Sequence, residues 1–238
     1  MNSLKTVARV KVKRNRTQQL YLSVLAGICI SLGGIGLSFI RSDSPLSYSL
    51  SGVLGGFVFS FGLFAIFALG LELFTGNCIF MSSYFKGDIT LEELLKLLGY
   101  TLLGNVMGCL LMWVIFSFAK FSYTDILRAM ANAKVDIPAV QLFARGVLCN
   151  IVISFATLLN MKGNDLLSSF LSACLPVIIF VACGFEHSIA DAFILLFSSL
   201  DICAIITCFI NVLLGNIVGG AIVAGLHYTF MSGNSYAR

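Results

Sequence analysis

The sequence contains few charged residues for its length. Of 238 residues, 11% are charged and 58% are hydrophobic, and the mean hydropathy is +0.98. A soluble domain carries about 25% charged residues because its surface must face water. This chain lacks the polar side chains needed to cover itself, so lipid must cover part of it. The composition excludes a soluble enzyme.

Histidines and paired cysteines are also scarce. The chain has two histidines, and its eight cysteines include no C-x-x-C pair. All eight lie in or beside apolar stretches, which is typical of small buried residues that stay reduced. Neither histidine has zinc-ligand spacing to a cysteine. We therefore expect neither a disulfide framework nor a metal site.

The first basic cluster stands next to the first apolar run. Six basic residues precede that run: Lys5, Arg9, Lys11, Lys13, Arg14 and Arg16. Beside a membrane span such a cluster is typical of a cytoplasmic anchor, and we favour this over nucleic-acid binding. The run 17–40 is too long for a signal peptide, and further apolar runs follow it. We expect a basic segment over 1–19 and one transmembrane domain over 20–238.

Long apolar runs recur along the whole chain. A transmembrane helix needs about 20 apolar residues. Six stretches qualify, and the fourth is interrupted only by Arg145: 17–40, 44–71, 97–119, 137–161, 166–185 and 202–237. The sequence therefore predicts an all-α membrane protein with six transmembrane helices. Two further apolar pieces, 73–85 and 192–200, are too short to cross.

Each short piece follows a long run after a polar break. The breaks contain Glu72 and Glu186, and they predict interruptions of the second and fifth helices near Leu73–Asn77 and Cys183–Ser188. Non-helical backbone at membrane depth is tolerated only where protein or a water-filled path surrounds it. The breaks therefore indicate a path through the protein.

The breaks recur with a similar spacing in both halves of the chain. Glu72 is followed 32 residues later by Gly104-Asn105, and Glu186 is followed 29 residues later by Gly215-Asn216. We read helices one to three (about 20–118) and four to six (about 136–231) as two copies of one unit. Three helices per copy give the copies opposite orientations, as in many transport proteins.

Basic residues predict the orientation. With the N-terminus inside, ten fall on the cytoplasmic side: the six of the first cluster with Lys86, Lys96, Lys162 and Arg238. Four fall outside: Arg41, Lys120, Arg128 and Lys134. The excess predicts cytoplasmic termini in a multi-pass protein of the cell's inner (plasma) membrane.

Three motifs together resemble one family. They are Gly-Phe-Glu-His-Ser-Ile-Ala at 184–190, Glu-Leu-Phe-Thr at 72–75, and Gly-Asn-x-x-Gly in the third and sixth runs. This set resembles the formate/nitrite transporter family. The resemblance implies a homopentamer of aquaporin-like protomers, each with its own pore for formate, nitrite, hydrosulfide or a related weak-acid anion. It implies no cofactor and no enzymatic activity. Glycines in the first and sixth runs permit close helix contacts, and they are a further indication of assembly.

His187 is the expected centre of the path. A bare anion in a narrow apolar pore is costly, and helix N-termini or a proton can compensate that cost. Histidine exchanges protons near neutrality, so we expect His187 to lend a proton to the anion. Thr75, in the matching break, can hold the anion or accept from the imidazole. His227 has no motif around it and is interpreted as packing or interface.

The family pattern assigns the remaining residues. It places Lys134, 53 residues before His187, in the outer vestibule, where it draws in anions. It places Phe59, Ile153 and Phe180 in an outer constriction, and Leu63, Leu73 and Phe74 in an inner one. Polar residues that brace the loops are Glu72, Glu186, Asn105, Asn150, Asn216 and Ser188. Arg145 is snorkelling, salt-bridged or pore-facing, and the sequence leaves this open.

Two rival functions were weighed. An aquaporin carries Asn-Pro-Ala in both half-helices, and none of the three prolines here follows an asparagine. An intramembrane enzyme with His187 as a base would need a nucleophile or metal set, and only Ser188 and Thr75 are available. Among anions, Gly76 and the Leu148–Asn150 segment lean slightly toward nitrite over formate, with hydrosulfide as the alternative.

Overall fold

The computed structural model describes residues 4–42 and 46–233, so Arg238 lies outside the described residues. In this part of the chain all regular structure is helical. The helices long and apolar enough to cross a bilayer are α2 (Arg16–Ser42), α3 (Tyr48–Leu69), α6 (Leu91–Ala119), α8 (Ala139–Asn160) and α11 (Ile202–Gly233). The other long apolar helix, α9 (Leu166–Ala182), has 17 residues and alone is shorter than the about 20 that a bilayer requires.

Chains of short helices follow α3 and α9. After α3 come α4 (Phe74–Asn77), the 3-10 turn η1 (Cys78–Phe80) and α5 (Met81–Phe85). After α9 come α10 (Ser188–Ile194) and the 3-10 turn η2 (Leu195–Phe197). Each chain begins beside one of the polar breaks.

The first break lies earlier than the sequence predicted. Helix α3 ends at Leu69 because Gly70 takes a left-handed φ of 64°, which glycine adopts without strain. The second helix is interrupted near Leu73–Asn77 as predicted, but the non-helical stretch is 70–73, because Phe74 already opens α4. In the second break Gly184 likewise has a left-handed φ, of 69°. That non-helical stretch is 183–187, and Ser188 opens α10.

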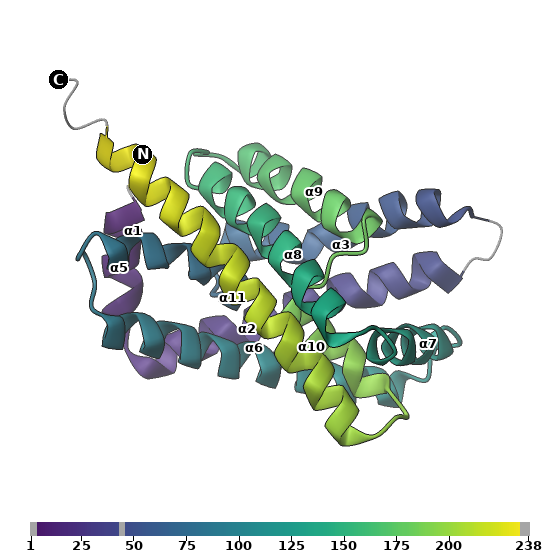
Figure 1. The fold of residues 1–238 in the computed structure, drawn as a ribbon. Helices are drawn as coiled ribbons and strands as arrows, with labels where there is room; N and C mark the ends of the chain where they lie inside the picture. The colour runs from purple at the N-terminus through teal and green to yellow at the C-terminus, as the bar shows by residue number, and fades with distance from the viewer. Residues whose placement is uncertain (1–3, 43–45, 234–238) are drawn as a thin grey trace.

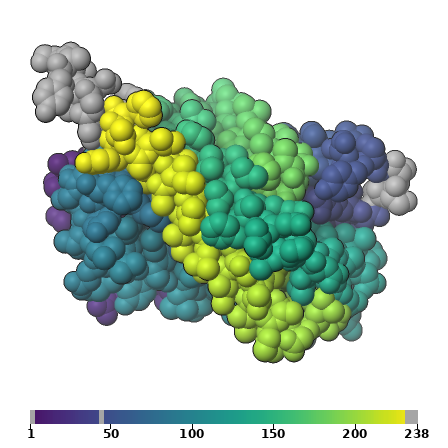
Figure 2. All heavy atoms as spheres, in the orientation of Figure 1, coloured from purple at the N-terminus to yellow at the C-terminus, as the bar shows by residue number. Residues whose placement is uncertain are grey.

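The long helices pack in pairs that match between the halves. Helix α2 lies along α6, α8 lies along α11, and α3 lies along α9 between the halves. In Figure 1, α11 runs diagonally across the front beside α8, with α1 and α5 at one end and α7 at the other. Figure 2 shows α11 as a continuous ridge on this face. The short helices α4 and α10 lie within this frame, so their ends are inside the protein.

Glycines allow the closest of these contacts. A Cβ on Gly27 of α2 would lie 2.1 Å from the backbone oxygen of Asn105 in α6, and one on Gly215 of α11 would lie 2.2 Å from that of Phe143 in α8. Only glycine permits this approach. These close contacts lie within one chain, so the glycines that make them serve the packing of the protomer, whereas Gly225 has no neighbouring atom within 4 Å of its Cβ position.

Two helices were not anticipated. Helix α1 (Leu4–Val12) lies in the predicted basic segment, and α7 (Thr124–Val135) lies between the third and fourth apolar runs. Both are amphipathic: Ala8 of α1, and Leu127 and Ala131 of α7, are buried. An ion pair of 2.8 Å between Lys5 Nζ and Asp88 Oδ1 holds α1 against the chain after α5. Each helix covers one end of the bundle (Figure 1).

Candidate functional site

Two asparagines hold the two breaks in matching ways. Asn105 Oδ1 accepts the N–H of Phe74 at 2.9 Å, and its Nδ2 donates to the carbonyls of Ser23 and Glu72, both at 2.8 Å. Asn216 Oδ1 accepts the N–H of Ser188 at 2.8 Å. Its Nδ2 donates to the carbonyls of Gly146 at 2.8 Å and Glu186 at 2.9 Å. Each asparagine therefore satisfies buried backbone groups that the break would otherwise leave unpaired.

His187 and Thr75 meet at the centre of the molecule. Thr75 Oγ1 and His187 Nε2 are 2.9 Å apart, and both residues are buried. The N–H of Ala190 donates to His187 Nδ1 at 3.2 Å, so a neutral ring carries its proton on Nε2. The ring of Phe180 stacks on the imidazole with centroids 5.8 Å apart. The imidazole is therefore held in one orientation, with the proton-bearing nitrogen toward Thr75.

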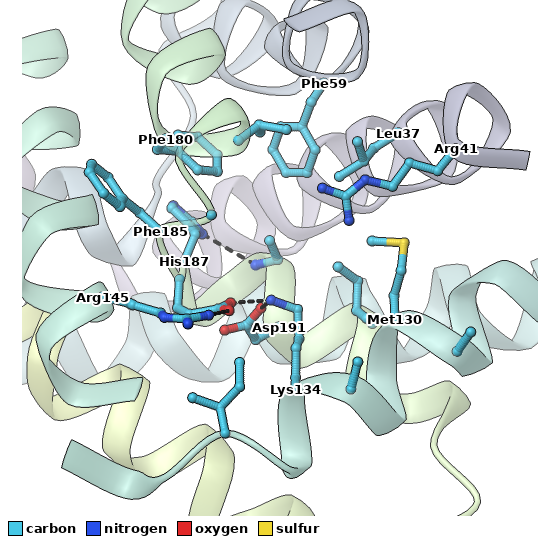
Figure 3. Close-up of a pocket in the computed structure, with 18 of the residues that line it drawn as sticks. Leu37, Arg41, Phe59, Met130, Lys134, Arg145, Phe180, Phe185, His187 and Asp191 are labelled. Atoms are coloured by element: carbon cyan, nitrogen blue, oxygen red, sulfur yellow. Dashed lines mark hydrogen bonds and ion pairs between the residues drawn. The ribbon is translucent and has the colours of Figure 1, made fainter. Parts of the chain in front are cut away.

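A cavity of about 390 Å³ opens on the α7 side of His187. We call it the α7 pocket, and Figure 3 shows His187 among its lining residues together with Arg41, Lys134 and Arg145. Lys134 Nζ pairs with a carboxylate oxygen of Glu186 and lies 2.9 Å from Asp191 Oδ1. Arg145 lies 4.0 Å from Glu186, so it is both salt-bridged and pocket-facing.

The charge of Lys134 is secured by its two partners. Burial lowers the pKa of Lys134, but the adjacent carboxylates of Asp191 and Glu186 outweigh burial and raise it above its usual value. Lys134 therefore remains an ammonium throughout the physiological pH range. The ammonium is already engaged in ion pairs with both carboxylates, so an anion would have to compete with them for it.

A second cavity, of about 310 Å³, lies on the α1 side. This α1 pocket is lined by Lys11 and Arg14, and both pair with the fully buried Glu72. Lys11 Nζ lies 2.8 Å from Glu72 Oε2 and 3.0 Å from Asn77 Oδ1. Burial lowers the pKa of Lys11 although Glu72 opposes the effect. Here two cations share one carboxylate, whereas Lys134 has two carboxylates.

The six predicted apolar residues are all buried, and three of them line one of the two pockets. Phe59 and Phe180 line the α7 pocket and meet edge to face with centroids 5.6 Å apart. Leu73 lines the α1 pocket. The remaining three, Leu63, Phe74 and Ile153, line neither of these pockets.

The remaining polar residues lie close to these features. Asn150 Nδ2 donates to the carbonyl of Asn216 at 2.6 Å, which ties α8 to α11. Ser188 is fully buried and its N–H is held by Asn216. His227 is 3.1 Å from Ser82 Oγ, far from His187 in sequence and not in either pocket. Among the described residues, no group of three His, Cys, Asp or Glu side chains could hold a metal ion.

Comparison with known proteins decides the family. The formate/nitrite transporter family model matches residues 1–230. The chain belongs to the formate/nitrite transporter family. This family, like the similar proteins described next, consists of channels and transporters rather than enzymes.

Individual members of the formate/nitrite transporter family resemble the chain over most of its length. The formate channel FocA of Escherichia coli (strain K12) is 27% identical, over 92% of this chain and 87% of its own. The nitrite transporter NirC of the same organism is 30% identical, over 87% and 81%. A solved pentameric formate channel with formate bound has 26% identity and a TM-score of 0.81, over 91% of this chain and 97% of its own. A solved FNT family ion channel has 27% identity and a TM-score of 0.83, over 96% and 95%.

The sequence analysis gave no pocket role to four charged residues that line these cavities: Lys11, Arg14, Arg41 and Asp191. Lys11 and Arg14 were interpreted as part of a cytoplasmic anchor, Arg41 was used only to predict the orientation, and Asp191 was given no role. The signal was available, because each buried glutamate of the breaks needs a cation and neither was assigned one. Asp191 lies four residues after His187, which is one helical turn. The side chains of Glu72 and Glu186 hold cations, while the asparagines hold the loop backbone.

Proposed function

We propose that this member of the formate/nitrite transporter family passes small monovalent weak-acid anions, nitrite or formate, across the plasma membrane. The single observation that carries the proposal is the position of His187. It lies buried 2.9 Å from Thr75 Oγ1, and a pocket with basic side chains lies on either side of it. An anion attracted to either pocket meets the imidazole before it can pass.

The path has a charged entrance at each end and an apolar middle. Lys134 on one side and Lys11 on the other attract the anion. Two apolar constrictions narrow the path between them. The outer one consists of Phe59, Phe180 and Ile153, and the inner one consists of Leu63, Leu73 and Phe74. A bare anion is unstable there, whereas its neutral acid is not. To act as a proton donor, His187 must first take up a second proton from water and become an imidazolium, for which Ala190 N–H has to release Nδ1. The imidazolium then passes a proton from Nε2 to the anion that Thr75 holds opposite the ring. The ring is left neutral and recovers the proton after passage.

The architecture of the transporter follows the same proposal. A single channel domain of six crossings is formed by α2, α3, α6, α8, α9 and α11, with α3 and α9 interrupted at the breaks. The excess of basic residues places the α1 side and both termini in the cytoplasm. The pentameric state of a similar formate channel supports a homopentamer with five separate pores.

Uptake into proteoliposomes tests the function directly. Purified protein is presented with nitrite, formate and hydrosulfide in turn, beside empty liposomes and the His187→Phe variant. We expect faster uptake of nitrite or formate than in both controls. Equal rates in all preparations would refute anion transport, and a preference for hydrosulfide would correct the substrate.

A further inference from the structure

Asp191 is a buried carboxylate in the α7 pocket that the transport path described above does not use. It is 1% exposed and lies on α10, one turn after His187. Its Oδ1 lies 2.9 Å from Lys134 Nζ. Its Oδ2 is buried and has no hydrogen-bond partner in the described part of the chain. One oxygen of this carboxylate, Oδ1, is therefore paired with Lys134, and the other, Oδ2, makes no hydrogen bond to the described residues.

The contact has a direct consequence for anion capture. Lys134 is paired with both Glu186 and Asp191, so an incoming anion must compete with two carboxylates for one ammonium. Glu186 has a second cation in Arg145 at 4.0 Å, and its backbone carbonyl is held by Asn216. Asp191 has Lys134 as its one ion-pair partner among the described residues. Asp191 is thus the carboxylate whose charge can change while Glu186 keeps a partner.

The surroundings of Asp191 act on its charge in opposite directions. Lys134 favours the ionised form, and Glu186 disfavours a second negative charge beside its own. The titratable and charged groups that lie near Asp191 on the surrounding elements are Arg41 on α2, Cys109 on α6, Lys134 on α7, Arg145 and Cys149 on α8, Glu186 and His187 before α10, and Cys208 on α11; α4 and η2 contribute none. With His187 neutral and the other acids and bases charged, three cations face two carboxylates in the pocket.

We propose that Asp191 sets the affinity of the α7 pocket by competing with the transported anion for Lys134, and that a proton from water on the α7 side removes this competition. The inference rests on the proposed function and adds a residue that determines affinity. When Asp191 is ionised, its ion pair with Lys134 weakens the attraction between Lys134 and the anion. Protonated Asp191 leaves the ammonium to Glu186 and the anion, and its Oδ2 can then donate to an anion oxygen. The proton returns to water when the anion has moved on.

The half-saturation concentration (KM) for formate uptake tests this proposal. Proteoliposomes are measured with equal pH on both sides, from about pH 5.5 to about pH 8, where formate itself stays ionised. In the wild type, KM should rise as pH rises. In Asp191→Asn it should be low and nearly constant, because the amide is uncharged at every pH. At about pH 8 we expect it about fivefold below the wild type, the effect of removing one unit charge about 4 Å from an ion in water.

A matched control separates this effect from a general change of surface charge. Asp125 is an exposed acid on α7, paired with Arg128 at 2.6 Å, and Asp125→Asn removes the same charge outside the pocket. Its KM should follow the wild type at every pH. In a Lys134→Gln background, Asp191→Asn should lower KM little, because Asp191 acts through Lys134. An equal decrease in that background would overturn the proposal.

The wild type alone provides a second test if Asp191→Asn does not assemble. A wild-type KM that stays constant from about pH 5.5 to about pH 8 overturns the proposal, as does an Asp191→Asn protein whose KM rises with pH as in the wild type. If the wild type takes up neither formate nor nitrite, the proposed function fails, and this inference fails with it. If uptake occurs with a pH-independent KM, only this inference fails.

Discussion

Asn216→Asp should destabilise the protein while changing hardly any volume. The introduced carboxylate can still accept the N–H of Ser188, but it loses the two donor bonds to the carbonyls of Gly146 and Glu186, which are 2.8 and 2.9 Å long. Each lost bond is worth about 1 kcal/mol, so the loss is at least about 2 kcal/mol. For a chain of this size, 1 kcal/mol shifts Tm by about 2–4 °C. We expect a decrease of about 4–8 °C.

The assay is the fraction of protein that remains monodisperse in detergent after heating, measured by size-exclusion chromatography. Asn105→Asp removes the matching donor bonds in the other half and should lower Tm similarly. Asn211→Asp is the control, since Asn211 is on the same helix and its side chain donates to Thr207 O near the surface. At about pH 5 the introduced carboxyl is more often protonated and can donate once, so the decrease should be smaller than at about pH 8. A Tm for Asn216→Asp equal to that of Asn211→Asp would refute the bracing role.

Three further predictions concern transport and assembly. Replacing His187 with Phe should abolish weak-acid uptake, and His187→Asn should lose the response to an imposed pH gradient; an unchanged response in liposomes would mean that the proton does not travel by this ring. Lys134→Glu should slow uptake at low external anion, and high salt should relieve this little because partly buried charges are screened much less than exposed ones, whereas Arg128→Glu, on the exposed face of α7, should change uptake little. The mass in detergent should be that of five chains, and a stable monomer or trimer would contradict the proposed assembly.

The long helices and the central pair could be predicted from the sequence, because apolar runs and motifs are local signals. Thr75 and His187 are 112 residues apart, and the likeness of the two breaks was enough to associate them. Helix α7 could not be found in this way, because five of its twelve residues are polar and it forms no apolar run. A search for runs that can cross a membrane does not detect a helix that covers the end of a bundle.

The position of the first break and the ion pairs required the structure. Gly70 ends α3 four residues before Phe74, and nothing in the sequence distinguishes it from the glycines inside helices. The pairing of Lys11 and Arg14 with Glu72 joins residues 61 and 58 positions apart. Such contacts depend on where α1 packs against the end of the bundle. Residue type and spacing do not determine this position.

The hydrogen bond from Ala190 N–H to His187 Nδ1 determines how a proton can cross this membrane protein. A histidine that conducts protons takes one up at one ring nitrogen and releases one from the other. Here the backbone N–H of Ala190 occupies Nδ1, and the one proton of the neutral ring is on Nε2, on the face toward Thr75. While this bond holds, Nδ1 cannot take up a proton as Nε2 releases one. We therefore expect that His187 does not relay protons by itself and that an empty pore leaves the proton gradient of the cell intact.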